Sequence, residues 1–197
     1  MRGSEEDFVA HGVPSPVDSF LGRNEDLRNV VGLLKRTRLL TVTGEPGLGK
    51  SSLVKAVANF FKDRRGLHFE HGVLYISAIN CVSHYTLQQR FVQCFAERPK
   101  GALKKLDTKD STQLFQTAIA QIARKSFLLI LDDAEDLLRI EKKKTEKDPL
   151  MVFFEQVLHG SPKTNILSTS KFELTAFIGS IKDISERVYR LGPLNPV

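Results

Sequence analysis

A glycine-rich loop of eight residues constrains this chain more than any other feature. Residues 44–51 read GEPGLGKS and fit the pattern G-x-x-x-x-G-K-[ST] at every fixed position. The apolar run 39–43 before the loop predicts a buried strand, and the residues after the loop carry an apolar stripe at helical spacing. A strand, this loop and a helix in that order predict a site for nucleotide phosphates.

Each residue type in the loop has a chemical role. Glycines let successive backbone N–H groups turn inward and cradle phosphates. Lys50 is placed to reach the β- and γ-phosphates, Ser51 to ligate Mg²⁺, and Ser52 to lie near the α-phosphate. The residues expected to bind the nucleotide here are Gly44, Glu45, Pro46, Gly47, Leu48, Gly49, Lys50, Ser51 and Ser52.

Two adjacent carboxylates follow a second apolar run. Residues 127–131 are all apolar, as in a strand covered on both faces, and Asp132 and Asp133 come directly after them. Such carboxylates are costly to bury without a cation, so we expect Asp132 to support Mg²⁺ and Asp133 to polarise an attacking water. A helix N-cap is the alternative role for either residue. Glu135 and Asp136 also remain candidates for positioning the water.

Strand and helix patterns alternate along the chain. They predict an α/β, three-layer P-loop NTPase fold with a five-stranded, mainly parallel sheet. One strand pattern lies along the chain between the loop and Asp132, which favours P-loop proteins that hydrolyse nucleotide with an acid beside the metal ligand, in an AAA-like order. A guanine-reading Asn-Lys-x-Asp segment is missing from the sequence, which favours adenine. The expected strands are 39–43, 73–79, 127–131, 165–169 and 187–191.

Composition restricts the class of protein further. Of 197 residues, 41% are hydrophobic and 26% charged, as in a globular domain. Apolar runs fall well short of the roughly 20 residues that span a bilayer, and the polar start is unlike a signal peptide. We therefore expect a cytoplasmic protein, with a polar N-terminal arm over 1–16 and a nucleotide-binding domain over 17–197. Residues 1–4, MRGS, resemble a vector remnant.

Neither the net charge nor the cysteine content indicates a further binding site beyond the one for nucleotide. The net charge of +6 permits a nucleic-acid partner without favouring one, because the basic residues are spread over several clusters. Cys81 and Cys94 lack metal-ligand spacing and are expected to be free thiols in a reducing compartment.

Several segments together resemble the STAND ATPases, the signal-transduction NTPases that include NB-ARC and NACHT proteins. Residues 20–27, FLGRNEDL, are similar to their h-h-G-R-x-x-E segment, with Asp26 where the family usually has Glu. Lys171 stands where the family's sensor strand usually ends in Arg, and it keeps the charge but loses the planar fork. The other similar segments are 40–53, 128–137, 165–171 and 189–194.

The resemblance implies where the rest of the nucleotide binds. Adenine would pack near Val17, Phe20, Leu21 and the exit turn at Pro193, with Arg23 also in the site. Family members hold ADP at rest, exchange it for ATP, and then oligomerise to signal. A winged-helix domain would follow Val197, so the resemblance implies that the chain is a fragment of a longer multidomain protein.

Two functions from different classes follow from these features. The first is an ATP/ADP-binding signalling switch with slow, Mg²⁺-dependent hydrolysis, in which Lys50, Asp133 and Lys171 act on the reacting phosphate and Asp132 and Ser51 on the metal. Its partners would be adenine nucleotide, other domains of a longer chain and a nucleotide-dependent homo-oligomer. The alternative is a DNA-linked ATPase of the initiator or clamp-loader kind, with Thr169 as a sensor. The intact Lys50, Ser51 and Asp132 argue against a vestigial site.

Overall fold

A parallel sheet forms the centre of the molecule. The computed structural model describes residues 8–16, 21–65, 67–81, 83–96, 110–138, 149–174 and 184–194. Six strands from these residues form one sheet in the order β1-β3-β4-β5-β2-β6, and all neighbouring strands are parallel. The strands are β1 (Val9–His11), β2 (Leu39–Thr43), β3 (Gly72–Ser77), β4 (Phe127–Asp132), β5 (Asn165–Ser170) and β6 (Glu186–Arg190).

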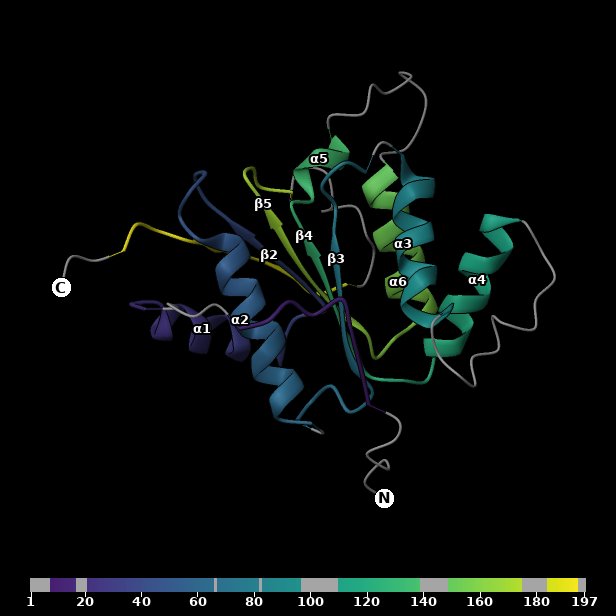
Figure 1. The fold of residues 1–197 in the computed structure, drawn as a ribbon, viewed down its shortest axis with the longest axis horizontal. Coiled ribbons are helices and arrows are strands. Elements are labelled where there is room, and N and C mark those ends of the chain that lie inside the picture. The colour runs from purple at the N-terminus through teal and green to yellow at the C-terminus, as the bar shows by residue number, and fades with distance from the viewer. Residues whose placement is uncertain are drawn as a thin grey trace.

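Helices cover both faces of this sheet and make the fold three-layered. Helices α1 and α2 lie on one face, and α3, α4 and α6 lie on the other (Figure 1). Alternate residues of β4 enter the two apolar cores, with Leu128 and Ile130 facing α2 and Leu129 facing the α3 side. The helices are α1 (Asn24–Leu34), α2 (Lys50–Asp63), α3 (His84–Ala96), α4 (Ser111–Ile122), α5 (Glu135–Leu138) and α6 (Pro149–Gly160).

Local sequence signals explain several helix starts. A serine before the helical pattern of Leu87 and Phe91 predicts an N-cap. The hydroxyl of Ser83 accepts a hydrogen bond from the backbone N–H of Thr86 at 3.2 Å, so Ser83 caps α3. Asp110 likewise accepts from the N–H of Thr112 at 2.9 Å and caps α4. Asn24 was expected to cap the first helix, but it is the first helical residue, and the N-cap Arg23 makes no side-chain capping bond.

The fold class is confirmed, and the strand count is corrected from five to six. The additional strand is β1, which lies within the segment expected to be an arm and pairs with β3 from Val9 to His11. Three residues carry too little periodicity to predict a strand. A short helix was expected over 172–178, yet residues 172–174 are not helical and the remainder lies outside the described residues.

The order of the strands in space is not their order along the chain. β3 lies between β2 and β4 along the chain, but β5 separates them in space, and β3 lies on the far side of β4. Sequence order alone does not give spatial order in a doubly wound sheet. Among the described residues, none of the helices is both long and apolar enough to cross a membrane.

Candidate functional site

The glycine-rich loop lies at the carboxyl end of β2 and leads into α2. Gly44, Gly47 and Gly49 have φ values of 153°, 83° and 89°, which residues with a Cβ rarely adopt. A Cβ on Gly44 would also come within 2.7 Å of the carbonyl oxygen of Leu191. The N-cap Gly49 offers no side chain to the first N–H groups of α2, so these donors remain free for an anion.

Lys50 lies over this loop. Its side chain is 8% exposed, and its ammonium donates hydrogen bonds to the carbonyl oxygens of Gly44 at 2.7 Å and Glu45 at 3.1 Å. The positive charge is therefore held at the loop by neutral acceptors. An arriving phosphate oxygen would offer this ammonium a stronger, charge-assisted partner.

Asp132 is held by hydroxyl groups from three different elements. Its Oδ1 accepts from Ser51 at 3.1 Å and from Thr169 at 2.6 Å. Its Oδ2 accepts from Tyr75 at 2.5 Å. The residue is 3% exposed, so these bonds fix the orientation of a carboxylate that water barely reaches. The predicted magnesium ligands Ser51, on α2, and Asp132, on β4, are thus brought together.

Asp133 adopts an unusual backbone conformation beside Asp132. Its φ is 59°, and its N–H donates to the hydroxyl of Thr169 at 2.8 Å. Burial raises the pKa of Asp133, and the carboxylates of Asp132, Glu135 and Asp136 raise it further, while Lys171 lowers it. A half-buried carboxyl with a raised pKa in a left-handed backbone conformation is typical of a functional position.

Glu135 and Lys171 form a pair next to these carboxylates. The ammonium of Lys171 lies 3.6 Å from Oε1 of Glu135, whose side chain is 2% exposed. The second oxygen of Glu135 is buried and has no hydrogen-bond partner among the described residues. Lys171 therefore compensates a buried charge, which sequence reasoning did not foresee.

Arg23 contacts the loop from the start of α1. Its guanidinium donates to the carbonyl oxygen of Leu48 at 2.9 Å and to Asp26 at 3.1 Å. Asp26 also accepts from the hydroxyl of Tyr189 on β6 at 2.6 Å. A chain of hydrogen bonds thus runs from the phosphate loop through α1 to the last strand.

The residues expected around adenine are only partly described. Val17 and Phe20 lie outside the described residues, whereas Leu21 is 80% exposed. A Cβ on Gly22 would lie 3.0 Å from Leu194, so the segment before α1 and the exit turn after β6 lie side by side. Pro193 in that turn is exposed, as are Glu45 and Pro46, and Ser52 is half-buried at the start of α2.

Sequence reasoning missed Tyr75, Tyr189 and the role of Glu135. Tyr75 is the one polar side chain among four aliphatic or glycine neighbours at 72–76, and that contrast was a usable signal. Burial and the neighbouring Asp132 raise the pKa of Tyr75, so its phenol keeps the proton that it donates. Tyr189 carried no comparable signal, because its partner Asp26 lies 163 positions away.

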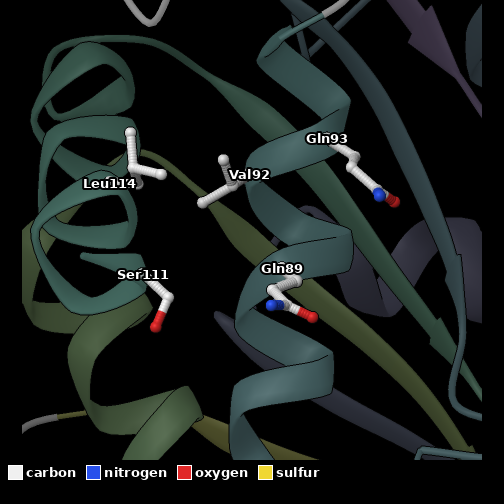
Figure 2. A pocket seen from close by; sticks show the side chains of 5 residues that line it. All are labelled: Gln89, Val92, Gln93, Ser111 and Leu114. Atoms are coloured by element: carbon white, nitrogen blue, oxygen red, sulfur yellow. The ribbon is translucent and has the colours of Figure 1, made fainter. Parts of the chain in front are cut away.

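A separate groove lies on the other face of the sheet. Val92 of α3 and Leu114 of α4 flank it, with Gln89 and Ser111 beside them (Figure 2). None of its lining residues belongs to the phosphate loop or to the Asp132 strand. The groove is therefore distinct from the candidate site.

Comparisons with known proteins agree with this geometry. The sequence profile of a family described as AAA ATPase domain matches residues 19–157, which include the phosphate loop and Asp132. Uncharacterized proteins of Mycobacterium bovis and Mycobacterium tuberculosis are 28% identical over 187 residues. These alignments cover 95% of this chain and 41% of each relative, so the chain spans about two-fifths of their length.

Solved structures of P-loop ATPases share the fold. The Drosophila origin recognition complex bound to DNA matches with a TM-score of 0.60 and 16% identity, over 87% of this chain and 43% of that chain. The ORC2 protein of Aeropyrum pernix, in ADPNP and ADP complexes, gives 0.58 and 13%, over 91% and 49%. A STAND protein of Pyrococcus horikoshii with a tetratricopeptide repeat sensor gives 0.50 and 14%, over 93% and 25%.

Proposed function

The chain belongs to the AAA ATPase domain family, and from that premise we propose that it binds ATP and ADP with Mg²⁺ and hydrolyses ATP slowly, as a switch. The observation that carries this proposal is the 3.1 Å hydrogen bond between Ser51 and Asp132. It joins the end of the phosphate loop to the acidic end of β4, the two parts that a P-loop enzyme needs at one place.

Phosphate binding is assigned to the loop and to Lys50. On binding, the ammonium of Lys50 would exchange the carbonyl oxygens of Gly44 and Glu45 for β- and γ-phosphate oxygens. The backbone N–H groups of the loop and the uncapped start of α2 would surround the phosphates. Charge-assisted bonds of this kind are about twice as strong as neutral ones.

The residues present fit a magnesium ion that is brought with the nucleotide. Mg²⁺ prefers oxygen ligands and binds with few protein groups, completing its shell with water and phosphate oxygens. Ser51 and Asp132 supply such oxygens side by side. In the described part of the chain, His, Cys, Asp and Glu nowhere gather in threes as a metal site, so the protein alone does not build a cage. When bound, the ion would neutralise charge on the transferring phosphate.

Hydrolysis is assigned to the carboxylates that follow Asp132. Asp133 would orient and polarise the attacking water. It follows Asp132 directly, and its raised pKa makes its carboxylate a stronger base. Glu135 is the second candidate, since one buried oxygen of its side chain has no partner among the described residues. Lys171 would stabilise the γ-phosphate charge after leaving Glu135, which lies 3.6 Å away.

Adenine is proposed to lie between the segment before α1 and the exit turn. Support comes from the contact of Gly22 with Leu194 and from the exposure of Leu21 and Leu194, at 80% and 54%. Exposed apolar side chains at the rim of a polar site are suited to the face of a base. Val17, Phe20 and Pro193 complete the proposed surface.

The finer proposal is a STAND-like signalling switch. The h-h-G-R segment supports it, because Arg23 links the phosphate loop to α1 and to Tyr189 through Asp26. The nucleotide state would then bias how β6 and its exit turn lie, with partners in other domains of a longer cytoplasmic chain or in a homo-oligomer.

An initiator-like, DNA-linked ATPase is the second candidate. The fold similarity to the origin recognition proteins favours it, one of which is bound to DNA, and the net charge of +6 is compatible with it. ATP hydrolysis stimulated by duplex DNA would favour this candidate over the STAND-like switch. Hydrolysis that ignores DNA would favour the switch.

The deciding experiment for the shared part of both candidates is simple. The purified protein is denatured and released nucleotide is identified by chromatography, and then ATP and ADP are titrated with and without Mg²⁺. Stoichiometric ADP, or Mg²⁺-dependent binding that Lys50→Ala removes, supports the proposal. Absence of ATP and ADP binding at millimolar concentration contradicts it.

A further inference from the structure

A basic pocket of about 370 Å³ lies at the opposite end of the sheet from the phosphate loop. Its charged side chains include Lys35, Arg36, Arg38 and Lys163. These residues come shortly before the first residues of β2 and β5, whereas the phosphate loop comes directly after the last residue of β2. The pocket is therefore independent of the site proposed for ATP.

Arg38 places a fixed positive charge in this pocket. Its Nε and a terminal nitrogen donate to the carbonyl oxygen of Thr164, at 3.1 and 2.9 Å, and that nitrogen also reaches Leu158 and Ser161 at 2.9 Å each. These acceptors are neutral. Burial lowers the pKa of Arg38, but a guanidinium keeps its charge at neutral pH. The charge is immobilised without a carboxylate partner in the described part of the chain.

Three exposed cations line the pocket together with Arg38. Lys35, Arg36 and Lys163 are exposed, and the ion pairs found among the described residues include none of them. His68 and Lys35 line the same pocket, and burial together with the charge of Lys35 lowers the pKa of His68. Cations from the turn between α1 and β2 and from the turn before β5 thus line one pocket.

Acidic side chains do not offset this charge. Among the described residues, none of those that line the pocket is acidic. Glu186 pairs with Leu39 in the adjoining strand, and burial raises its pKa. Asn165 instead fixes the geometry, because its amide donates to the carbonyl oxygens of Leu34 and Thr37 at 2.7 and 3.0 Å. These bonds anchor the turn that carries Lys35 and Arg36.

We propose that this pocket binds the phosphate groups of a nucleic-acid backbone. A fixed guanidinium with flexible lysines around it is suited to phosphate, which both side chains bind. The cations come from separate segments and are open to solvent, which suits successive phosphates of a polymer. His68 is the one aromatic side chain among the described residues of the lining, and contacts to phosphates carry no sequence information, so binding should be independent of sequence.

The test compares two charge-matched double variants of the whole chain. Binding of a fluorescent DNA duplex of about 20 base pairs is followed by anisotropy at several salt concentrations. Lys35→Gln with Lys163→Gln should weaken binding at least about tenfold and lower the salt slope by about 2, since each phosphate contact contributes about 0.9. The control, Arg28→Gln with Lys55→Gln, removes the same charge from α1 and α2 and should change affinity less than about twofold.

Other outcomes would overturn the proposal. Equal weakening by both double variants would show an effect of net charge alone. Absence of duplex binding, together with protection of Lys163 from chemical acetylation by inorganic phosphate, would show a site for the free anion only. Affinity for a fluorescent ATP analogue is measured on each variant, and its retention shows that the variants are folded. A failure of DNA binding is then separate from a failure of the proposed ATP site.

Discussion

The hydroxyl of Tyr75 on β3 donates a 2.5 Å hydrogen bond to Oδ2 of Asp132 on β4. Ser51 and Thr169 bind the other carboxylate oxygen. Because Tyr75 takes one oxygen, Oδ1 is left as the atom that faces the phosphate loop through Ser51. Tyr75, which does not belong to the phosphate-binding motif, thus helps to fix the orientation of Asp132 from the neighbouring strand β3.

Replacing Tyr75 with Phe tests this positioning role. The change leaves Oδ2 of a buried carboxylate without a partner, which should cost about 1–3 kcal/mol in the free energy of unfolding. Asp132 should also turn more freely, so the Mg²⁺ dependence of ATP affinity should weaken while Mg²⁺-free affinity is kept. Denaturant unfolding and nucleotide titrations check both effects. Tyr85→Phe, at an exposed tyrosine, is the control, and an unchanged Mg²⁺ dependence in Tyr75→Phe would refute the role.

Lys50→Ala should weaken ATP affinity about 10- to 100-fold, since charge-assisted hydrogen bonds contribute about 1.5–3 kcal/mol. The folded protein loses only bonds to the carbonyl oxygens of Gly44 and Glu45. Isothermal titration with Mg-ATP is the measurement. Lys55→Ala, one turn further along α2, should bind as the wild type does, and equal affinities of the two variants would contradict the assignment.

The pH dependence of hydrolysis should follow Asp133. Burial and three neighbouring carboxylates raise its pKa, and the ionised form is the one that polarises water. The rate should therefore fall as pH drops through a pKa above the usual value of about 3.9. Stability has the opposite sign, because the folded state holds this proton more tightly. The contribution of Asp133 to stability is present below the unfolded pKa and lost as pH rises through the folded one.

Asp133→Asn combines both effects in one variant. Hydrolysis should drop at least about 100-fold, within the range for loss of a general base, while the melting temperature at pH 7 should rise because a buried charge is removed. Asparagine tolerates the φ of 59° at this position. Steady-state hydrolysis and thermal unfolding give the answer. If Glu135→Gln abolishes hydrolysis and Asp133→Asn does not, Glu135 positions the water.

Lys171 has two expected roles that substitutions separate. Lys171→Met leaves the buried Glu135 without its cation at 3.6 Å, so both stability and the preference for ATP over ADP should decrease. Lys171→Arg keeps the charge and adds a planar fork, so stability should be kept and the preference for ATP should rise a few-fold. Thermal unfolding and paired ATP and ADP titrations measure the two. An ATP preference that neither variant alters would leave Lys171 as only a partner of Glu135.

Local patterns were sufficient to predict the elements that carry phosphate chemistry. The loop at 44–51, the apolar run before Asp132 and the caps Ser83 and Asp110 each lie within one short segment. Parallel strands with continuous apolar runs then required helices on both faces. Because these signals are local, they predict the elements even when the order of the strands in the sheet is unknown.

Spatial order was harder to predict. The placement of β5 between β2 and β4 depends on which crossover passes over which strand, and residues 165–169 do not encode that choice locally. The same limit hid Tyr75 and Tyr189, whose partners lie 57 and 163 positions away. The short β1 was missed because it forms only against the edge of β3.

The residue after the last strand is hydrogen-bonded to the residue before the phosphate loop. The N–H of Leu191 donates to the carbonyl oxygen of Thr43 at 2.8 Å, and its own carbonyl oxygen lies 2.7 Å from where a Cβ on Gly44 would be. A displacement of Leu194 would therefore reach the loop within three residues, through the backbone of Leu191. Force on the exit turn should therefore alter the affinity of the loop for phosphate, and phosphate binding should in turn alter the position of the exit turn.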